Sequence, residues 1–124
     1  MSQNNASAMA FSMPGGEICA KARSRPVDLV HLARQTMGDR SLEQEVLRLF
    51  VQQALLVRDQ IVSANVAERL RLAHGLKGSA GGVGAFAIAD CAAEIEKAPA
   101  DRQHLTRLAR LIDEVRDFIA AIGR

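Results

Sequence analysis

The chain has 124 residues, 48% of them hydrophobic, and its 16 Lys and Arg against 14 Asp and Glu leave a net charge of +2. This length fits a single domain. Because only 3% of the residues are aromatic and Trp and Tyr are missing, the core must consist of Leu, Ile, Val and Ala, which favours an all-α fold. The small net charge and the scarcity of aromatic side chains argue against nucleic-acid binding.

The cysteines and the absence of long apolar segments indicate in which cellular compartment we expect the protein. Cys19 and Cys91 are too few to form a disulfide framework, so we expect two free thiols in a reducing compartment. No apolar run approaches the roughly 18 residues of a membrane span. Residues 1–11 also lack the basic and apolar regions of a signal peptide. We therefore expect a cytoplasmic protein that is neither secreted nor membrane-spanning.

Composition divides the chain into an N-terminal tail, residues 1–25, and one folded domain, residues 26–124. The tail is rich in Ser, Asn, Gly and Ala, contains a Pro-Gly-Gly turn at 14–16 and shows no sustained apolar period. Within it, residues 17–24 are a candidate for a short helix that packs on the domain.

The domain begins with two predicted helices. Asp28 is positioned to cap a short helix that extends to Gln35, and Gly38 suits the stop after it. Asp39 or Ser41 then starts a second, longer helix. Its apolar stripe has the i, i+3, i+4 spacing of a buried helix face and consists of Leu42, Val46, Leu49, Phe50, Ala54, Val57 and Ile61.

Three more helices follow. The third begins near Val66, the fourth spans residues 85–97 and is ended by Pro99, and the fifth extends from about Asp101 to Ile122. Short connections favour antiparallel neighbours. We therefore predict an all-α fold in which four long helices form an up-and-down antiparallel four-helix bundle, with a short additional N-terminal helix.

Residues 72–84, LAHGLKGSAGGVG, place one histidine and five glycines in the third predicted helix and the turn that follows it. On a helical wheel His74 lies at the edge of the apolar arc and is directed to solvent. A glycine inside a helix costs about 1 kcal/mol relative to alanine, so Gly75 and Gly78 require a compensating role. Bare backbone beside a nucleophilic imidazole indicates a surface where another molecule docks at His74. The arc itself comprises Val66, Leu70, Leu72, Ala73, Leu76, Ala80 and Val83.

The charges near His74 fit a phosphoryl group. Arg71 and Lys77 lie within one helical turn of the imidazole, and a phosphoryl group would bring about −1.5 to −2 charges to this place. Ser79 adds a hydroxyl, although on the wheel it lies nearer the core and suits a hydrogen bond back to its own helix.

The segment resembles a known family. His74-Gly-Leu-Lys77-Gly78-Ser79-Ala80 is similar to the His-x-Leu-Lys-Gly-Ser/Ala-Ser/Ala pattern of the histidine-containing phosphotransfer (HPt) domain. Family members often have a second hydroxyl residue at the position of Ala80 and a polar residue at that of Gly75. The likeness extends over about residues 27–122, through Asp28, Gly38-Asp39, Phe50, Gly84-Ala85, Cys91 and Glu94 or Glu96.

The resemblance implies that His74, through its Nε2, accepts a phosphoryl group from the phospho-aspartate of one receiver domain and returns it to another. It also implies that Lys77 stabilises the phosphoryl charge and that Gly78 makes room for the receiver's loops. Arg71, Gly75 and Ser79 would belong to the same docking surface. In such a transfer the protein mainly positions the reactants and neutralises charge.

The same resemblance implies a phosphoryl carrier of a bacterial-type multistep phosphorelay and not a turnover enzyme. It would bind no ATP and have no cofactor of its own, since the partner receiver would supply the Mg²⁺. The expected partners are response-regulator receiver domains and a hybrid histidine kinase. We expect no nucleic acid, no membrane and a monomer, because the bundle closes within one chain.

The sequence does not support a phosphate-binding loop or a metal site among these residues. The stretch lacks the G-x-x-x-x-G-K-[ST] order of a phosphate-binding loop. His31, His104 and the cysteines show no metal-ligand spacing, so we predict no metal site and interpret both histidines as solvated helix positions. The later glycines, Gly81, Gly82 and Gly84, are interpreted as the end of one helix and the turn into the next.

Two rival functions remain open. One is the dimerisation and phospho-acceptor module of a sensor histidine kinase, but the sequence lacks the His-Glu/Asp pair with a downstream proline that such modules show, and no ATP-binding segment follows. An obligate dimer would favour this rival. The other is a phosphorylation-silent adaptor bundle that binds receiver domains, for which His74→Gln would leave signalling intact.

Overall fold

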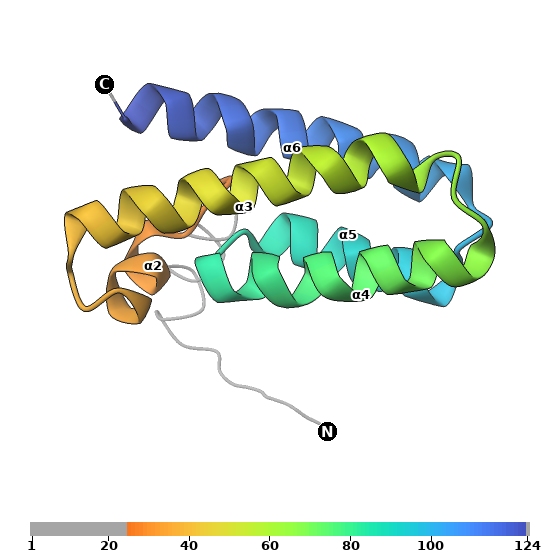
Figure 1. Cartoon of the computed structure of the whole chain (residues 1–124), viewed down its shortest axis with the longest axis horizontal. Helices are drawn as coiled ribbons and strands as arrows, with labels where there is room; N and C mark the ends of the chain where they lie inside the picture. The colour runs from red at the N-terminus through yellow and green to blue at the C-terminus, as the bar shows by residue number, and fades with distance from the viewer. Residues whose placement is uncertain (1–24, 124) are drawn as a thin grey trace, which may run out of the picture.

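The computed structural model describes residues 25–123, and every secondary-structure element in this part of the chain is a helix (Figure 1). The all-α prediction is therefore confirmed for the described residues. The candidate helix at residues 17–24 and Cys19 lie outside them. The helices are α2 (Leu29–Gln35), α3 (Arg40–Ile61), α4 (Val66–Val83), α5 (Phe86–Lys97) and α6 (Arg102–Ile122).

Side-chain caps determine where most of these helices begin. Asp28 accepts hydrogen bonds from the backbone N–H groups of Val30 and His31, as the sequence predicted. Of the two starts considered for α3, the structure selects Asp39, whose carboxylate accepts from the N–H of Leu42. Asn65 and Asp101 cap α4 and α6 in the same way.

The four longer helices lie alongside one another (Figure 1). In space α3 packs on α4 and α6, and α5 likewise packs on α4 and α6, so that each helix has two neighbours. The short helix α2 packs against α4. The core between them is almost entirely aliphatic, and its largest fully buried side chains are Leu32, Ile61, Leu76, Ile88, Ile95, Leu108 and Ile112.

The predicted apolar stripe of α3 is partly wrong. Leu42 and Leu49 are 45% and 51% exposed, whereas Leu47, which the stripe omitted, is 4% exposed. The buried line of α3 instead consists of Leu47, Phe50, Ala54, Val57 and Ile61. Core contact covers only the part of the apolar arc that faces the neighbouring helices, so the leucines at its edge remain in solvent. Val66 and Ile122, at the first and last positions of their helices, are also exposed.

A buried arginine, which the sequence analysis did not single out, joins the two connections at one end of the molecule. Arg69 on α4 is 8% exposed and donates to three backbone carbonyls. The acceptors are Ile61 O at 2.9 Å, Val62 O at 2.6 Å and Pro99 O at 2.9 Å. Because the last carbonyls of a helix have no partner within it, Arg69 satisfies the end of α3 and complements its dipole.

At the opposite end, Gly84 ends α4 in the left-handed conformation, with φ 90°. Its carbonyl accepts from Asp28 N at 2.9 Å, and a Cβ here would approach Asp28 O to 2.8 Å. Gly84 is therefore the predicted turn residue. Gly81 and Gly82 lie within the last turn of α4, at the helix end where the sequence placed them.

His31 is not the solvated residue predicted from the sequence. Its Nε2 is 3.2 Å from Gly82 O, and its ring meets Phe86 edge-on with centroids 5.2 Å apart. The ring is held because α2 folds back over the end of α4 and the start of α5. His31 thus has a structural role in this part of the fold.

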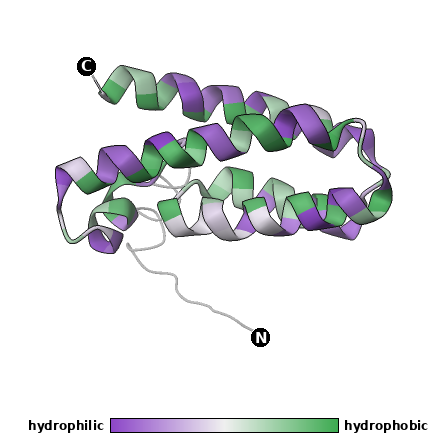
Figure 2. Ribbon diagram, in the orientation of Figure 1, coloured by the Kyte–Doolittle hydropathy of each residue, from purple (hydrophilic) through white to green (hydrophobic). Residues whose placement is uncertain are grey.

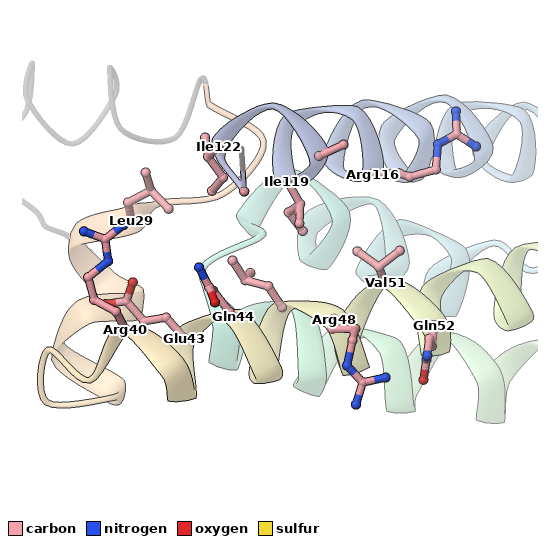
Figure 3. A pocket seen from close by; sticks show the side chains of 13 residues that line it. Leu29, Arg40, Glu43, Gln44, Arg48, Val51, Gln52, Arg116, Ile119 and Ile122 are labelled. Carbon is pink, nitrogen blue, oxygen red and sulfur yellow. The ribbon is translucent and has the colours of Figure 1, made fainter.

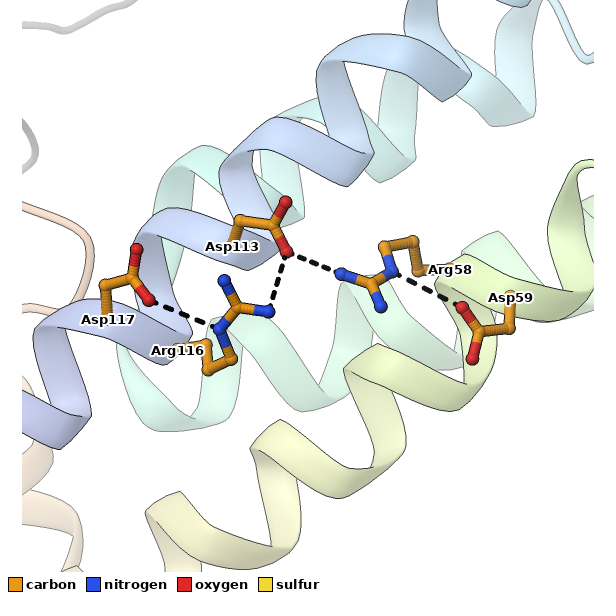
Figure 4. Close-up of polar contacts among 5 residues, drawn as sticks. All are labelled: Arg58, Asp59, Asp113, Arg116 and Asp117. Carbon is orange, nitrogen blue, oxygen red and sulfur yellow. Dashed lines mark hydrogen bonds and ion pairs between the residues drawn. The ribbon is translucent and has the colours of Figure 1, made fainter.

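On the outer face, a chain of ion pairs links α3 to α6 (Figure 4). Asp113 of α6 contacts Arg58 of α3 at 2.5 Å and Arg116 at 3.2 Å, and each arginine also contacts an adjacent aspartate, Asp59 or Asp117. Partly exposed pairs of this kind each contribute little to stability. They add to the α3–α6 contact that the core already makes.

Among the described residues, no helix combines the length and apolar character needed to cross a bilayer. Cys91 is a buried free thiol whose Sγ lies 3.4 Å from His104 O, and burial raises its pKa. The thiol is therefore protonated at neutral pH.

Candidate functional site

His74 lies in the middle of α4 and, as predicted, is directed to solvent, with 73% of its side chain exposed. The opposite face of α4 packs into the core through Ala73, Leu76 and Ala80, each fully buried. Because the helical period places residue 74 away from these three, the buried face fixes the direction of the imidazole.

The structure places Glu96 of α5 beside the imidazole. Glu96 Oε2 is 3.0 Å from His74 Nδ1, and Glu96 Oε1 is 2.6 Å from Lys77 Nζ. One carboxylate thus contacts both residues predicted to act in phosphoryl chemistry. Small residues of α4 and α5, among them Ala80 and Ala92, are fully buried and allow the two helices to approach closely.

The hydrogen bond from Lys77, and after it that from His74, lowers the pKa of Glu96 below its usual value. Glu96 is therefore an ionised carboxylate at neutral pH, and an ionised carboxylate only accepts hydrogen bonds. We infer that His74 Nδ1 carries the ring proton and donates a hydrogen bond to Glu96. The lone pair of the neutral ring then lies on Nε2, the nitrogen that Glu96 does not contact.

Lys77 follows His74 by three positions, so both side chains reach the α5 edge of α4. Its side chain is 40% exposed, and its ammonium lies at the Glu96 carboxylate. The cation is therefore held at the imidazole by Glu96, and it remains accessible to an anion that arrives from solvent.

The glycines beside His74 leave open space. A Cβ added at Gly75 or at Gly78 would have no atom within 4 Å among those considered. Core packing therefore does not require glycine at either position. Ser79 donates its hydroxyl to Gly75 O at 3.2 Å, the bond to its own helix that the sequence predicted.

Arg71 is not directed at His74. Its Nη2 lies 2.5 Å from both carboxylate oxygens of Glu68, one turn earlier on α4, and its side chain is 70% exposed. Part of its charge is thereby neutralised. Of the two predicted cations, the structure brings only Lys77 into the group around the imidazole.

The Hpt domain family matches residues 41–122, which is well over half of the chain. The chain belongs to the Hpt domain family. Hpt domains are helical phosphocarrier modules of two-component phosphorelays, where they interact with receiver domains and kinases. Comparisons with curated proteins and with solved structures give no match.

In this Hpt domain, the sequence analysis missed the role of Glu96. It named Glu94 or Glu96 only as part of the family resemblance. Both lie on α5, and helical periodicity does not say which one faces α4. The structure separates them: Glu94 pairs with Lys97 at 3.5 Å, whereas Glu96 contacts the imidazole.

One groove of this Hpt domain lies away from His74, where α2, the first half of α3 and the end of α6 meet (Figure 3). It encloses about 430 Å³, its walls include Leu29, Leu47, Val51 and Ile119, and none of the predicted site residues lines it. Within residues 25–123, no three His, Cys, Asp or Glu side chains gather as a metal site would require.

Proposed function

We propose that this Hpt domain carries a phosphoryl group on Nε2 of His74 between the aspartates of receiver domains. The observation that carries the proposal is the 3.0 Å contact between His74 Nδ1 and Glu96 Oε2. Because the Nδ1–H group donates to a carboxylate, the nucleophilic lone pair of the exposed imidazole lies on Nε2, where it can react with an incoming partner.

In the proposed step, the Nε2 lone pair attacks the phosphorus of a receiver's phospho-aspartate. The N–P bond forms as the P–O bond to the aspartate breaks, and the aspartate leaves as a free carboxylate. The ring keeps its Nδ1 proton and gains positive character, which the adjacent Glu96 carboxylate stabilises. Transfer to the next receiver is the reverse step with a different aspartate.

Lys77 has a second task in this proposal. A phosphoryl group on Nε2 would add negative charge near the ammonium, which Glu96 Oε1 contacts at 2.6 Å. Electrostatic stabilisation and positioning are what phosphoryl transfer chiefly requires from a protein. The bare backbone at Gly75 and Gly78 supplies the space for the receiver's loops.

The scaffold that we propose for this chemistry is an up-and-down antiparallel four-helix bundle of α3 to α6, supported by the contacts among these helices. The chain would act as a monomer in the cytoplasm, without ATP. Its partners would be response-regulator receiver domains and a hybrid histidine kinase. The Mg²⁺ would belong to the receiver, whose phospho-aspartate pocket completes the site.

The test is phosphate transfer from a panel of phosphorylated receiver domains to the native protein, to His74→Gln and to His104→Gln. We expect an acid-labile, base-stable label on the native protein and on His104→Gln, but none on His74→Gln. Label on the His74→Gln protein would contradict the proposal. Receiver binding without any label would favour the phosphorylation-silent adaptor instead.

A further inference from the structure

We propose that the N-terminal segment of this chain binds in the groove between α2, α3 and α6, with the Phe11 ring inside the groove and Glu17 paired with Arg40. The inference goes beyond the proposed function, because the groove lies away from His74. It assigns one occupant to the groove, residues 9–17 of the same chain.

The groove presents apolar surface that the described residues leave uncovered. Leu29, Val51 and Ile119 line it, and all three are only partly buried although they pack against the core. Ile122, at the end of α6, adds a side chain that is 42% exposed. Figure 2 shows this end of α6 as mostly hydrophobic. An occupant that covers this surface gains the free energy of apolar burial.

The sequence before the domain contains a matching apolar cluster. Met9, Phe11 and Met13 lie within five residues, and residues 1–16 contain no Asp, Glu, Lys or Arg. A Phe ring offers a large apolar area, and Met side chains adapt to irregular gaps. An uncharged segment also loses no charge hydration when it enters a groove. The groove and the cluster are therefore complementary in apolar character.

The covalent connection brings the segment to one end of the groove. Arg25 leads into α2, and Leu29, the first residue of α2, lines the groove beside Arg40 (Figure 3). The 14 residues from Phe11 to Arg25 span up to about 45 Å when extended, so the cluster can reach every part of the groove. Because the segment is tethered, its effective concentration there is on the order of millimolar, and weak contacts suffice.

The charges indicate the direction in which the segment lies. Glu17 is the only acidic residue before Asp28. Among residues 25–123, no carboxylate pairs with Arg40 at the entrance of the groove. The other arginines of the groove, Arg48 and Arg116, already pair with carboxylates of their own helices. Glu17 therefore belongs at Arg40, where the segment enters.

The spacing along the segment agrees with the length of the groove. Arg40 and Val51 are 11 residues apart on α3, which is about 16 Å along the helix axis. The six residues from Phe11 to Glu17 extend over about 20 Å. With Glu17 at Arg40, the Phe11 ring therefore reaches the apolar wall that Val51 and Ile119 form.

A second copy of the chain fits the groove less well than its own segment. A two-fold dimer would place the groove against itself. Two hollow surfaces that face each other leave their apolar walls uncovered. A small amphiphilic anion would use Arg40 as Glu17 does, but it must come from solution, whereas the segment is always present at the groove.

The first test is NMR of the full-length protein with labelled methyl groups. We expect nuclear Overhauser effects between the ring protons of Phe11 and the methyl groups of Val51 and Ile119. Phe11→Gln should abolish them and shift these methyl resonances, whereas the methyl resonances of Val62, beyond the far end of α3, should stay in place. Ser7→Gln, a control in the same segment, should change neither set. A Phe11 ring without contacts to the groove would overturn the proposal.

Proteolysis of the full-length protein gives a second readout. Chymotrypsin cleaves after phenylalanine, so a bound Phe11 is protected in the native protein. Val51→Gln, which places an amide in the apolar groove, should raise the rate of cleavage after Phe11 by about fivefold or more. Val62→Gln changes a valine that is 45% exposed at the other end of α3 and should stay within about twofold of the native rate. Equal rates in all three proteins would overturn the proposal.

Charge reversal tests the ion pair. Glu17→Arg should speed the same cleavage, because it places two cations together. The double variant Glu17→Arg/Arg40→Glu reverses the pair and should restore protection of Phe11. A double variant that is cleaved as fast as Glu17→Arg would contradict the Glu17–Arg40 pair.

Sedimentation and solvent extraction test the other occupants. A native dimer that Val51→Gln converts into a monomer would assign the groove to a second copy. One equivalent of an amphiphile extracted from the native protein would assign it to a small molecule, and either result would overturn the proposal. The proposed function fails on a different observation, namely that neither receivers nor phosphoramidate, a small phosphoryl donor, label His74. None of the tests of the segment involves phosphate.

Discussion

Glu96 follows His74 by 22 residues in the chain, and its Oε2 lies 3.0 Å from His74 Nδ1. The contact spans two helices and joins the nucleophile to a carboxylate that also holds Lys77 at 2.6 Å. The sequence pattern around His74 lies wholly on α4. The group that orients its imidazole comes from α5.

Replacing Glu96 by glutamine should slow phosphorylation of His74 by about tenfold or more, because the amide no longer fixes the Nδ1 proton or stabilises a cationic ring. The measurement is the rate of labelling by receivers and by phosphoramidate. ¹⁵N NMR of the His74 ring gives a second readout, since the share of the Nδ1–H tautomer should fall. Glu94→Gln is the control. An unchanged tautomer in Glu96→Gln would contradict the positioning role.

Because the pKa of Glu96 is lowered, the contribution of Glu96 to the unfolding free energy should depend on pH. A carboxyl whose pKa is depressed in the folded state stabilises it above the unfolded pKa, and this contribution is lost as the pH falls through the folded pKa. The contribution of Glu96, measured as the difference in unfolding free energy between the native protein and Glu96→Gln, should therefore be present at neutral pH. It should shrink only in acid, below the usual Glu pKa of about 4.3.

Lys77→Met should raise the Glu96 pKa toward its usual value, since the Lys77 hydrogen bond is the largest cause of the shift. ¹³C NMR titration of the Glu96 carboxyl measures the change. Lys97→Met, which removes an exposed lysine that pairs with Glu94, should leave the Glu96 pKa in place. An equal shift in both variants would contradict a specific Lys77–Glu96 contact.

Gly78→Ala should stabilise the fold and impair transfer. A Cβ there meets no atom within 4 Å, so the helix gains about 0.5–1 kcal/mol in unfolding free energy. The same methyl group occupies the surface where a receiver approaches, so the transfer rate should fall. Urea unfolding and receiver labelling measure the two effects. Undiminished transfer would show that Gly78 is not at the interface.

Gly84→Ala should have the opposite effect on stability. Gly84 has φ 90°, and an added Cβ would approach Asp28 O to 2.8 Å. We expect a loss of about 2 kcal/mol or more, from the strained backbone and from displacement of the segment that leads into α2. Urea unfolding checks this beside Gly78→Ala. An unchanged free energy of unfolding would mean that the Asp28–Gly84 contact adjusts to the added methyl group without loss of stability.

Arg69→Met should destabilise the fold by about 3 kcal/mol, since it leaves three backbone carbonyls without their buried donor. The exposed pair partner Arg71 provides the matched control, and Arg71→Met should cost less than about 1 kcal/mol. Chemical denaturation of both variants gives the comparison. Equal losses would contradict the assignment of Arg69 as the buried link between the two connections.

The sequence alone predicted the helices and the direction of His74. The Asp28 cap, the stop near Gly38 and the apolar periods are local signals, and local hydrogen bonds and side-chain spacing decide them. The His74-to-Ala80 pattern indicated the family for the same reason: its residues are neighbours along one helix, so their spacing in the chain is their spacing on the surface.

Only the tertiary structure decided which residues meet across helices. Periodicity shows that α3 has an apolar arc, but the neighbouring helices determine that Leu47 is buried and Leu49 exposed. In the same way it cannot choose between Glu94 and Glu96, or predict that Arg69 reaches Pro99 O from another helix. These contacts depend on how helices rotate and pack against one another, and that rotation is set by the fit of the whole core.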